Sequence, residues 1–405
     1  MSESVFDGVR ILDFTVALAG PYSTMLMASM GADVIKIENP VLPPPGGANR
    51  TGAPDDNIGG MSFFFANANA GKRAVSINLK SEEGKEIFTK LIQEADVLVE
   101  NNRPGVMKRL GFDYESVCKI NPRIIYASGS GFGQTGLYWR NPGYDIIGQA
   151  MGGSMSVTGF PGDPPMNAEP SFSDCSVSVN LCNAIAAALL NREITGKGSY
   201  VETCLVDGVV TDQEYQMPFA VYGEEPKQIG NRYNRVGGPM DGYYAADGYF
   251  VIQCTTQKEF EDLCHVMGKP ELITDERFAT PEARLASAQA DDPLKAIITA
   301  WAADKKVEEV FELLKAADVP AFPIYNFKDI FESDHIRGTR EMFTTATSKE
   351  GAEMLLTGTP IKMSKYKTAI VRACSALGGD NDEIIGALGY SKEELDELRA
   401  KGVIS

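Results

Sequence analysis

The sequence predicts an α/β protein in which a large domain with a Rossmann-like parallel sheet is joined to a smaller α+β domain. Short aliphatic runs alternate with helical patterns from residue 9 to residue 204, which is the order of a parallel sheet with crossover helices. After residue 225 the order changes to a hairpin followed by consecutive helices. The length of 405 residues also exceeds what one hydrophobic core usually organises.

The first elements form a βαβ unit. A strand at 9–14, a helix at 21–30 and a strand at 33–38 follow one another without a long insertion. A right-handed crossover makes such strands parallel and places a ligand crevice at their carboxyl ends, near Ala17 and Leu18 and again just after Glu38. No G-x-G-x-x-G stretch lies between the strands, so the sequence lacks the dinucleotide fingerprint.

The rest of the large domain continues the alternation. Residues 39–60 are rich in Pro, Gly and Asn, which fits either a loop that covers a ligand or an ordinary solvated loop. The elements expected next are strands at 72–79, 97–100, 124–128 and 200–204, and helices at 81–95, 145–151 and 175–191.

Basic residues gather around the strand ends of this domain. An anionic phosphate ligand would require such groups, but charged residues also lie at strand ends for solubility, and the pattern fits both. The residues are Lys72, Arg73, Lys80, Arg103, Lys108 and Arg109.

We expect residues 1–205 and 340–405 to form the large domain and residues 225–325 the small one, with linkers at 206–224 and 326–339. A helix over 205–222 is expected to leave the large domain. In the small domain the sequence predicts a hairpin at 243–254 that turns at Asp247-Gly248, helices at 257–267, 293–303 and 306–317, and a strand at 320–325. The last helix begins at Ser391 with a complete capping box.

The composition excludes several classes of partner. A net charge of −17 and a pI of about 4.7 argue against binding to nucleic acid or to an anionic membrane. No apolar run is long enough to span a bilayer, and residues 1–7 resemble no signal peptide. We therefore expect a cytoplasmic protein.

The chain has too few suitably placed cysteines and histidines for a metal site or a catalytic triad. The seven cysteines are scattered, mostly within apolar segments, which is typical of reduced core thiols. The only histidines are His265 and His335, so neither a His-rich zinc site nor a Ser-His-Asp triad is expected. Cys175 lacks a nearby histidine to activate it. Any chemistry is expected to depend on carboxylates.

Asp174 stands at the start of the most apolar helix. Helical spacing places the side chains of Val177, Leu181, Ile185, Ala188 and Leu189 on one buried face. A carboxylate in the first turn lies at the positive end of the helix dipole, which favours its ionised form, and free N–H groups there could stabilise an oxyanion. Asp174 is therefore either a helix cap or a nucleophile.

The chain resembles the class III CoA-transferases, also called the CaiB/BaiF group, over essentially its whole length. The segments that carry the resemblance are Leu12-Asp13-Phe14-Thr15, Ala19-Gly20-Pro21, residues 31–38, Asn69 with Lys72-Arg73, Leu79-Lys80, Ala95-Asp96-Val97, Asn121-Pro122, Gly143-Tyr144-Asp145, Ser173-Asp174 and residues 195–198.

The resemblance implies an acyl-CoA enzyme that forms an interlocked, ring-shaped homodimer. It implies that Asp174 attacks the donor thioester and then carries CoA as an aspartyl thioester, so coenzyme A is a substrate and no prosthetic group or metal is required. By similarity, Ala17 and Leu18 lie along the pantetheine path of CoA, and Tyr144 and Asp145 lie near the acyl group. The residues expected around the nucleotide and phosphates are Ile77, Lys80, Asn101, Asn102, Arg109 and Leu110.

The chain departs from the family pattern at two places. Asn39 replaces a basic residue that often follows the position of Glu38, which puts one phosphate contact in doubt. The glycine run of the oxalate-specific member is reduced to Gly237-Gly238, which remains a candidate lid element together with residues 39–60 and 223–241.

Two other functions are also compatible with this resemblance. A 2-methylacyl-CoA racemase of the same fold carries His where this chain has Tyr144, and tyrosine, with a reference pKa of about 10, is a poor base near neutral pH. A CoA-binding protein without turnover is the other alternative, and the Asp174 position argues against it. No residue in the sequence identifies the carboxylic acid.

Overall fold

The computed structural model divides into two compact units, which are described separately. It describes residues 4–44, 46–52, 57–58, 60–213, 216–223, 225–232, 237–289 and 292–405. The first unit contains residues 1–154, 167–222 and 334–405, and the second contains residues 155–166 and 223–333.

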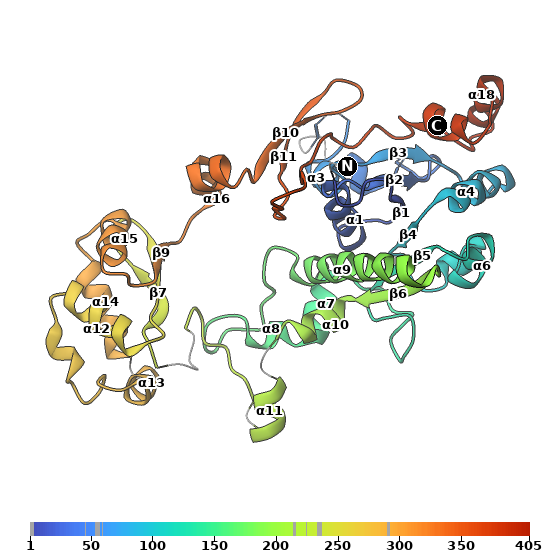
Figure 1. The fold of residues 1–405 in the computed structure, drawn as a ribbon. Helices are drawn as coiled ribbons and strands as arrows, with labels where there is room; N and C mark the ends of the chain where they lie inside the picture. The colour runs from blue at the N-terminus through green and yellow to red at the C-terminus, as the bar shows by residue number, and fades with distance from the viewer. Residues whose placement is uncertain are drawn as a thin grey trace. The chain divides into compact units, whose positions relative to one another are not determined.

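A six-stranded parallel sheet forms the centre of the first unit, as predicted (Figure 1). The strand order is β3-β2-β1-β4-β5-β6, and all five neighbouring pairs are parallel. Since the order reverses between β1 and β4, the carboxyl ends of these two strands form the topological switch point of the sheet. The strands are β1 (Arg10–Phe14), β2 (Asp33–Glu38), β3 (Arg73–Ser76), β4 (Val97–Glu100), β5 (Ile125–Ser130) and β6 (Ser199–Cys204).

Each face of this sheet is covered by helices. Helices α1 (Ala19–Ser29) and α9 (Phe172–Thr195) pack together on one face, and α4 (Glu82–Glu94) covers the other. The five side chains predicted for the inner face of α9 are all buried, which confirms its helical period. The remaining helices of this part are α2 (Ala48–Thr51), α3 (Phe63–Ala68), α5 (Val106–Leu110), α6 (Tyr114–Ile120), α7 (Asp145–Gly152), α10 (Leu205–Thr211) and α11 (Gln216–Tyr222).

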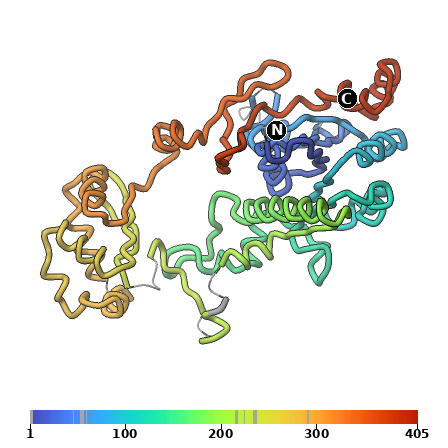
Figure 2. Tube along the Cα trace, viewed as in Figure 1, coloured from blue at the N-terminus to red at the C-terminus, as the bar shows by residue number. Residues whose placement is uncertain are grey.

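The C-terminal part of the chain, drawn from orange to red in Figure 2, returns to the first unit. It contains a hairpin of β10 (Phe343–Thr347) and β11 (Glu353–Thr357), which the sequence analysis did not predict. Helices α17 (Asn381–Ala387) and α18 (Lys392–Ala400) follow. The capping box at Ser391 is present, as predicted.

The second unit is an α+β body. Its antiparallel sheet contains β7 (Met240–Tyr244), β8 (Tyr249–Gln253) and β9 (Ala321–Pro323), and the predicted hairpin is formed by β7 and β8. Its core lies between this sheet and the helices. The helices are α8 (Ser154–Val157, at the boundary of the units), α12 (Gln257–Val266), α13 (Pro281–Gln289), α14 (Pro293–Ala302), α15 (Val307–Ala316) and α16 (Phe327–Glu332), with short 3₁₀ and π turns at Pro270–Ile273 and, in the first unit, Asp334–Thr339.

Two sequence-based expectations need correction. The single helix expected over 205–222 is two helices, α10 and α11, because Pro218 cannot donate to a preceding turn and is tolerated only near a helix start. The statement that no apolar segment could span a bilayer also fails for α9, which meets that criterion by length and composition. Arg192 near its end is buried and paired with Asp96, which identifies α9 as a core helix of this unit.

Candidate functional site

The site begins at the switch point of the sheet, between the loops that follow β1 and β4. The Asn101 side chain connects these loops, since Val16 N donates to Asn101 Oδ1 at 2.7 Å and Asn101 Nδ2 donates to Val16 O at 2.8 Å. Ala17, the next residue, has a positive φ of 59°. A non-glycine residue in this region is uncommon, and such strain persists where neighbouring contacts hold the loop in place.

Asp174 opens onto a cavity of about 280 Å³ at this switch point. Five predicted site residues line it together, although they lie far apart in the sequence: Ala17, Asn101, Asn102, Tyr144 and Asp174. The other lining residues are Val16, Ala19, Arg103, Val106, Gly129, Ser130, Gly131, Pro142, Gly143 and Leu205. Among the described residues, Asp174 carries the only carboxylate in this lining, which combines small and apolar residues with polar side chains and the guanidinium-bearing Arg103.

Asp145 does not line this cavity but caps the helix that carries Asp174. Its Oδ1 accepts from the backbone N–H of Ser173 at 2.8 Å and of Asp174 at 3.2 Å, and from Ser173 Oγ at 2.9 Å. Gln149 Nε2 donates to its other oxygen at 2.6 Å. The expectation that first-turn N–H groups are free for an oxyanion therefore fails for Ser173 and Asp174, because both are already donated to Asp145.

The expected effect of the helix dipole on Asp174 is also corrected. Burial, followed by the nearby negative charge of Asp145, raises the pKa of Asp174 to about 6. These two effects outweigh the dipole, which alone favours the ionised form. Asp174 is still mainly ionised at neutral pH, and a raised pKa makes it a stronger base and nucleophile than an ordinary aspartate. Burial, followed by the charges of Asp174 and Asp145, raises the pKa of the Cys175 thiol, which argues against a thiolate there.

A second cavity of about 380 Å³ adjoins the first. The two share Val16, Ala17 and Asn102 as lining residues. The second cavity extends toward the end of β2, where Glu38 and Asn39 line it, and this is the other place where the sequence predicted a crevice.

Beneath the second cavity lies a buried cluster of charges that the sequence analysis missed. The carboxylate of Asp13 binds Lys36 Nζ at 3.1 Å and Lys72 Nζ at 2.7 Å, and all three side chains are at most 3% exposed. Thr15 Oγ1 and Thr24 Oγ1 donate to the same carboxylate. Lys36 is also among the residues that line the second cavity, although its ammonium group is held by Asp13 and Thr15 and its side chain is only 3% exposed.

The predicted group of phosphate-binding cations is divided by the fold. Lys72 is fully buried in the Asp13 cluster, and Arg73 binds Asp33 at the amino end of β2, so neither faces the crevice. Both lie before or at the start of β3 rather than after its end, which corrects the sequence-based placement. Arg103 lines the Asp174 cavity. Lys80 and Arg109 are exposed and remain predicted ligands.

The other predicted contacts are placed differently. Ile77 is 1% exposed in the hydrophobic core, so only its backbone could reach a ligand. Leu18 is the N-cap residue of α1, next to the cavity wall, and Leu110 packs against the core. Asn102 lines both cavities and is held by Glu100, whose Oε2 accepts from Asn102 N at 2.8 Å.

Arg103 also lines a third cavity of about 450 Å³, on the side of α5 and α6. Tyr114, Tyr126 and Tyr200 pack together there and, with Trp139, form an aromatic wall. None of the CoA-path residues predicted from the sequence lines it.

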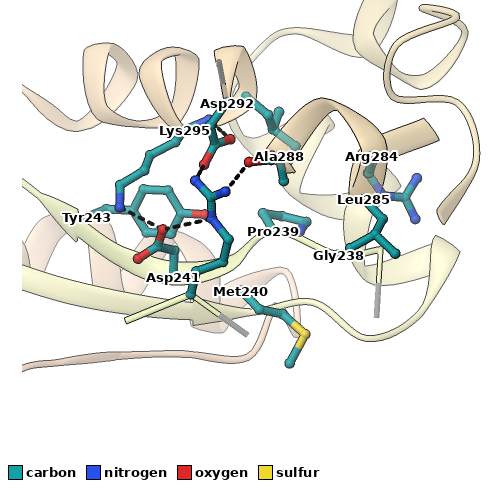
Figure 3. Close-up of a pocket in the computed structure, with 12 residues that line it drawn as sticks. Gly238, Pro239, Met240, Asp241, Tyr243, Arg284, Leu285, Ala288, Asp292 and Lys295 are labelled. Carbon is teal, nitrogen blue, oxygen red and sulfur yellow. Dashed lines mark hydrogen bonds and ion pairs between the residues drawn. The ribbon is translucent and has the colours of Figure 1, made fainter. Parts of the chain in front are cut away.

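The second unit offers no comparable space at its ion cluster (Figure 3). Asp241 binds Lys295 at 2.6 Å, while Arg232 binds Asp292 at 2.5 Å and donates to Ala288 O. The cavity they line has about 20 Å³, which is room for about one water molecule. Gly237 and Gly238 also pack against backbone there, since an added Cβ would lie 1.6 Å from Pro281 O and Cys254 O respectively. The lid role of these two glycines stays a prediction. Residues 45, 53–56, 59, 224 and 233–236 of the other lid candidates lie outside the described residues.

Histidine and metal chemistry find no support in the described residues. They contain no group of three or more His, Cys, Asp and Glu side chains arranged to hold a metal ion. His265 is in the second unit on α12 and His335 is in the π turn, so neither is among the residues that line the Asp174 cavity.

The fold and the site thus define an α/β protein with a largely buried carboxylate in a cavity at the switch point of a parallel sheet, which is where such folds bind their ligands. The model of CoA-transferase family III matches residues 6–381. The chain is 40% identical to the acetyl-CoA:oxalate CoA-transferase of Acetobacter aceti, over 89% of this chain and 90% of that protein. It is 36% identical to the formyl-CoA:oxalate CoA-transferase of Streptomyces coelicolor, over the full length of both. A CaiB/BaiF family structure from Brucella suis is similar, with a TM-score of 0.84 and 32% identity, covering 96% of this chain and 100% of that one.

The chain belongs to the class III CoA-transferases, the CaiB/BaiF family, as the sequence landmarks predicted. It is therefore a CoA-transferase, and CoA thioesters are the substrates of its family. The racemase and the non-catalytic binder are not favoured by these relatives.

Proposed function

We propose that this protein moves CoA from an acyl-CoA donor to a small carboxylic acid through covalent intermediates on Asp174. The observation that supports the proposal most is the convergence of Asp174, Ala17, Asn101, Asn102 and Tyr144 on one cavity at the switch point. The two relatives described above are named for CoA transfer with oxalate, which is a carboxylic acid. We propose that the acceptor of this protein is also a carboxylic acid.

The proposed reaction proceeds in four balanced steps. The Asp174 carboxylate attacks the donor carbonyl, so that a C–O bond forms, the C–S bond breaks and CoA leaves as a thiolate. The thiolate then attacks the aspartyl carbonyl of this anhydride, which releases the donor acid and leaves an aspartyl-CoA thioester. The acceptor carboxylate attacks this thioester and releases the thiolate again. Attack of the thiolate on the acceptor carbonyl of the second anhydride gives the new acyl-CoA and free Asp174.

Asp145 and the pKa of Asp174 support this assignment. With a pKa of about 6, the buried Asp174 carboxylate is mostly ionised at neutral pH, so the reactive form is present. The raised pKa also makes this carboxylate a stronger nucleophile than an ordinary aspartate. Asp145 fixes the first turn of α9 through Ser173 and Asp174, which orients the nucleophile. Because those N–H groups are occupied, we assign oxyanion stabilisation to other donors around the cavity, such as Ser130.

We propose that CoA runs from the Asp174 cavity through the second cavity toward the ends of β2 and β3. The residues assigned to it are those of the sequence prediction: Ala17, Leu18, Ile77 by its backbone, Lys80, Asn101, Asn102, Arg109 and Leu110, with Tyr144 near the acyl group. Asp145, predicted beside Tyr144, is assigned to the start of α9 instead, where its carboxylate accepts from Ser173 and Asp174. Lys36 adds a positive charge at the wall of the second cavity. No prosthetic group or metal takes part in the proposed steps.

The assembly is also proposed. We infer an interlocked homodimer in the cytoplasm, with residues 206–224 and 326–339 as linkers between the two domains. Apolar side chains on α7 and α9 are exposed in one chain, which supports burial by a second copy. They are Ile146, Ile147, Met151, Val179, Leu190 and Ile194.

The mechanism is tested with hydroxylamine, which attacks the activated aspartyl carbonyl of Asp174 in the anhydride or the thioester and displaces the donor acid or the CoA thiolate. Incubation with a panel of acyl-CoA thioesters should leave a hydroxamate on the peptide that contains Asp174, detected by mass spectrometry. Asp174→Ala should abolish both this product and acyl exchange while CoA binding stays nearly intact. Asp174→Glu serves as a control for charge, because it keeps the carboxylate but displaces it. Exchange retained in Asp174→Ala would exclude the mechanism.

A further inference from the structure

Gln149 is a fully buried side chain of α7 that the proposed steps do not use, and it lines none of the cavities described above. It lies four residues after Asp145 on the same helix, a spacing that makes the two side chains neighbours. Gln149 Nε2 donates to Asp145 Oδ2 at 2.6 Å, whereas the other oxygen of Asp145 accepts from the start of α9. Gln149 therefore contacts the group that caps the helix of Asp174.

The hydrogen bonds of Gln149 fix the orientation of its amide. Besides Asp145, Nε2 reaches the backbone O of Ala168 at 3.1 Å, and Oε1 accepts from Ala168 N at 2.8 Å. The opposite orientation would turn the amide oxygen toward two acceptors and the NH₂ group toward a donor. A carboxylate of the same shape could make only the bond to Ala168 N, so the three bonds together require an amide.

Both partners of Gln149 belong to segments that determine where α9 begins. Asp145 accepts from the backbone N–H groups of Ser173 and Asp174. Ala168 lies in the segment that enters the helix, shortly before its N-cap residue, Ser171. The side chain of Ser171 makes no capping hydrogen bond, so the cap comes from Asp145.

We propose that Gln149 is a positioning residue for the nucleophile: its amide holds the Asp145 carboxylate in the orientation that fixes the first turn of α9 and hence Asp174. This role rests on the proposed function, because it takes Asp174 as the nucleophile. A neutral donor suits the place. A lysine or arginine would neutralise Asp145, whereas an amide leaves in place the charge that helps to raise the pKa of Asp174.

The first test reverses the donor without changing the shape of the side chain. Gln149→Glu turns a carboxylate oxygen toward Asp145 Oδ2, so two acceptors of like charge face each other. We expect the rate of Asp174 hydroxamate formation at saturating donor thioester to fall about 100-fold, the scale for an error of about 1 Å in a site. The KM for the donor should change little, since Gln149 lines none of the described cavities.

The second test exchanges the two groups of the pair. When Gln149→Glu is combined with Asp145→Asn, the new amide at position 145 can donate to the new carboxylate at position 149. Its oxygen can still accept from Ser173 N and Asp174 N. We expect the double variant to be about 10-fold faster than Gln149→Glu alone, a coupling of the size found between residues in contact.

Gln213 provides a matched control on the same helix. Its Nε2 donates to the backbone O of Gly152, at the end of α7, and to Val209 O at 3.0 Å. Gln213→Glu thus makes the same change of donor to acceptor away from Asp145 and should keep the parental rate. Gln149→Met removes the donor without adding a charge and should lower the rate about 10-fold. It tests the role even if Gln149→Glu does not fold, which circular dichroism and urea unfolding would reveal.

Four results would overturn the role of Gln149. A parental rate in folded Gln149→Glu or in Gln149→Met would remove it from positioning. A loss that the double variant does not reduce, or an equal loss in Gln213→Glu, would make it a structural residue of α7. A raised donor KM with an unchanged saturating rate would assign it to donor binding. By contrast, absence of the Asp174 hydroxamate in the parent protein would refute the proposed function itself.

Discussion

Asp145 affects Asp174 in two ways, through hydrogen bonds to the helix start and through its negative charge. As a cap, Asp145 fixes the helix start that carries Asp174; as a charge, it raises the pKa of Asp174. The two roles can be separated by replacing the carboxylate with an amide, whose Oδ1 can still accept the same N–H bonds.

We expect donor acylation to fall as pH decreases through about 6, because the reactive form of Asp174 is the ionised one. Asp145→Asn removes the charge that helps to raise this pKa, so the acid limb should move to lower pH. The measurement is the pH profile of kcat/KM for hydroxamate formation. Asp207→Asn, which changes a carboxylate of α10, is the control and should leave the limb in place. If the acid limb of Asp145→Asn stays at the same pH or moves to higher pH, the charge of Asp145 does not raise the pKa of Asp174.

Asp13 holds two buried ammonium groups and is expected to dominate local stability. Burial alone would raise its pKa, but Lys36 and Lys72 more than offset this and hold the pKa well below its usual range. Burial lowers the pKa of Lys72 to about 8, with Asp13 opposing the shift. A depressed carboxyl pKa stabilises the fold above the unfolded pKa of about 3.9, and this contribution is lost as pH falls below it.

Asp13→Asn should therefore reduce the free energy of unfolding by about 3–5 kcal/mol, since both lysines lose their counter-charge inside the protein. The measurement is urea unfolding at pH 7, repeated below pH 4. Asp33→Asn is the control: its side chain is 33% exposed, and a pair of that kind contributes about 0–1 kcal/mol. Equal effects of the two substitutions at pH 7 would show that the cluster is not a stabilising unit.

At the scale of elements, the loop between β5 and α7 is held by contact between two glycines. An added Cβ at Gly143 would lie 2.6 Å from Gly131 Cα, and one at Gly131 would lie 2.8 Å from Gly143 Cα. Both glycines line the Asp174 cavity, and Tyr144 follows directly. Only glycine permits this approach, so the contact fixes one wall of the site.

Gly143→Ala should displace that wall and lower kcat/KM about 100-fold, the scale expected for an error of about 1 Å in a site. Overall stability should change less, because the loop is partly exposed. Gly386→Ala in α17 is the control, since its Cβ would meet no atom within 4 Å. Circular dichroism confirms the fold of each variant, and full activity of Gly143→Ala would show that the wall tolerates the shift.

The elements show which parts of the fold the sequence could predict. The parallel sheet and the buried face of α9 were predicted because both depend on local periodicity. The β10–β11 hairpin was not predicted, although its sequence carries a signal: buried Met354 and Leu356 alternate with exposed residues after a turn at Gly351. The break before α11 could likewise have been found from Pro218.

The site depended on contacts between distant residues, which periodicity does not reveal. Asp174 was recognised from its helix start and its family motif, but its cap comes from Asp145, 29 residues earlier. Lys72 looked like a phosphate ligand because no local signal shows that its partner is Asp13, 59 residues away. Arg103 was predicted in the same group of basic residues, for which phosphate binding and solubility were both open, and only the fold places it on the wall of the Asp174 cavity.

At the scale of the whole molecule, the proposed interlocking would have a consequence that an ordinary dimer lacks. Two rings that pass through each other cannot separate while both remain closed, so folded subunits should not exchange. The exposed apolar side chains of α7 and α9 provide the surface that the second copy would cover. Such a dimer must form during folding rather than by docking of finished monomers.

We expect light scattering at micromolar concentration to give twice the 43.8 kDa mass of one chain. When tagged and untagged folded proteins are mixed, no hybrid dimer should appear over many hours, whereas co-expression or joint refolding should give hybrids in the statistical ratio. Because exchange of a closed pair requires unfolding, added urea should accelerate it only near the unfolding transition. A monomer would contradict the dimer itself. Rapid exchange of subunits between folded dimers would be compatible with a dimer but would exclude interlocking. The exposed faces of α7 and α9 would then be an ordinary docking surface.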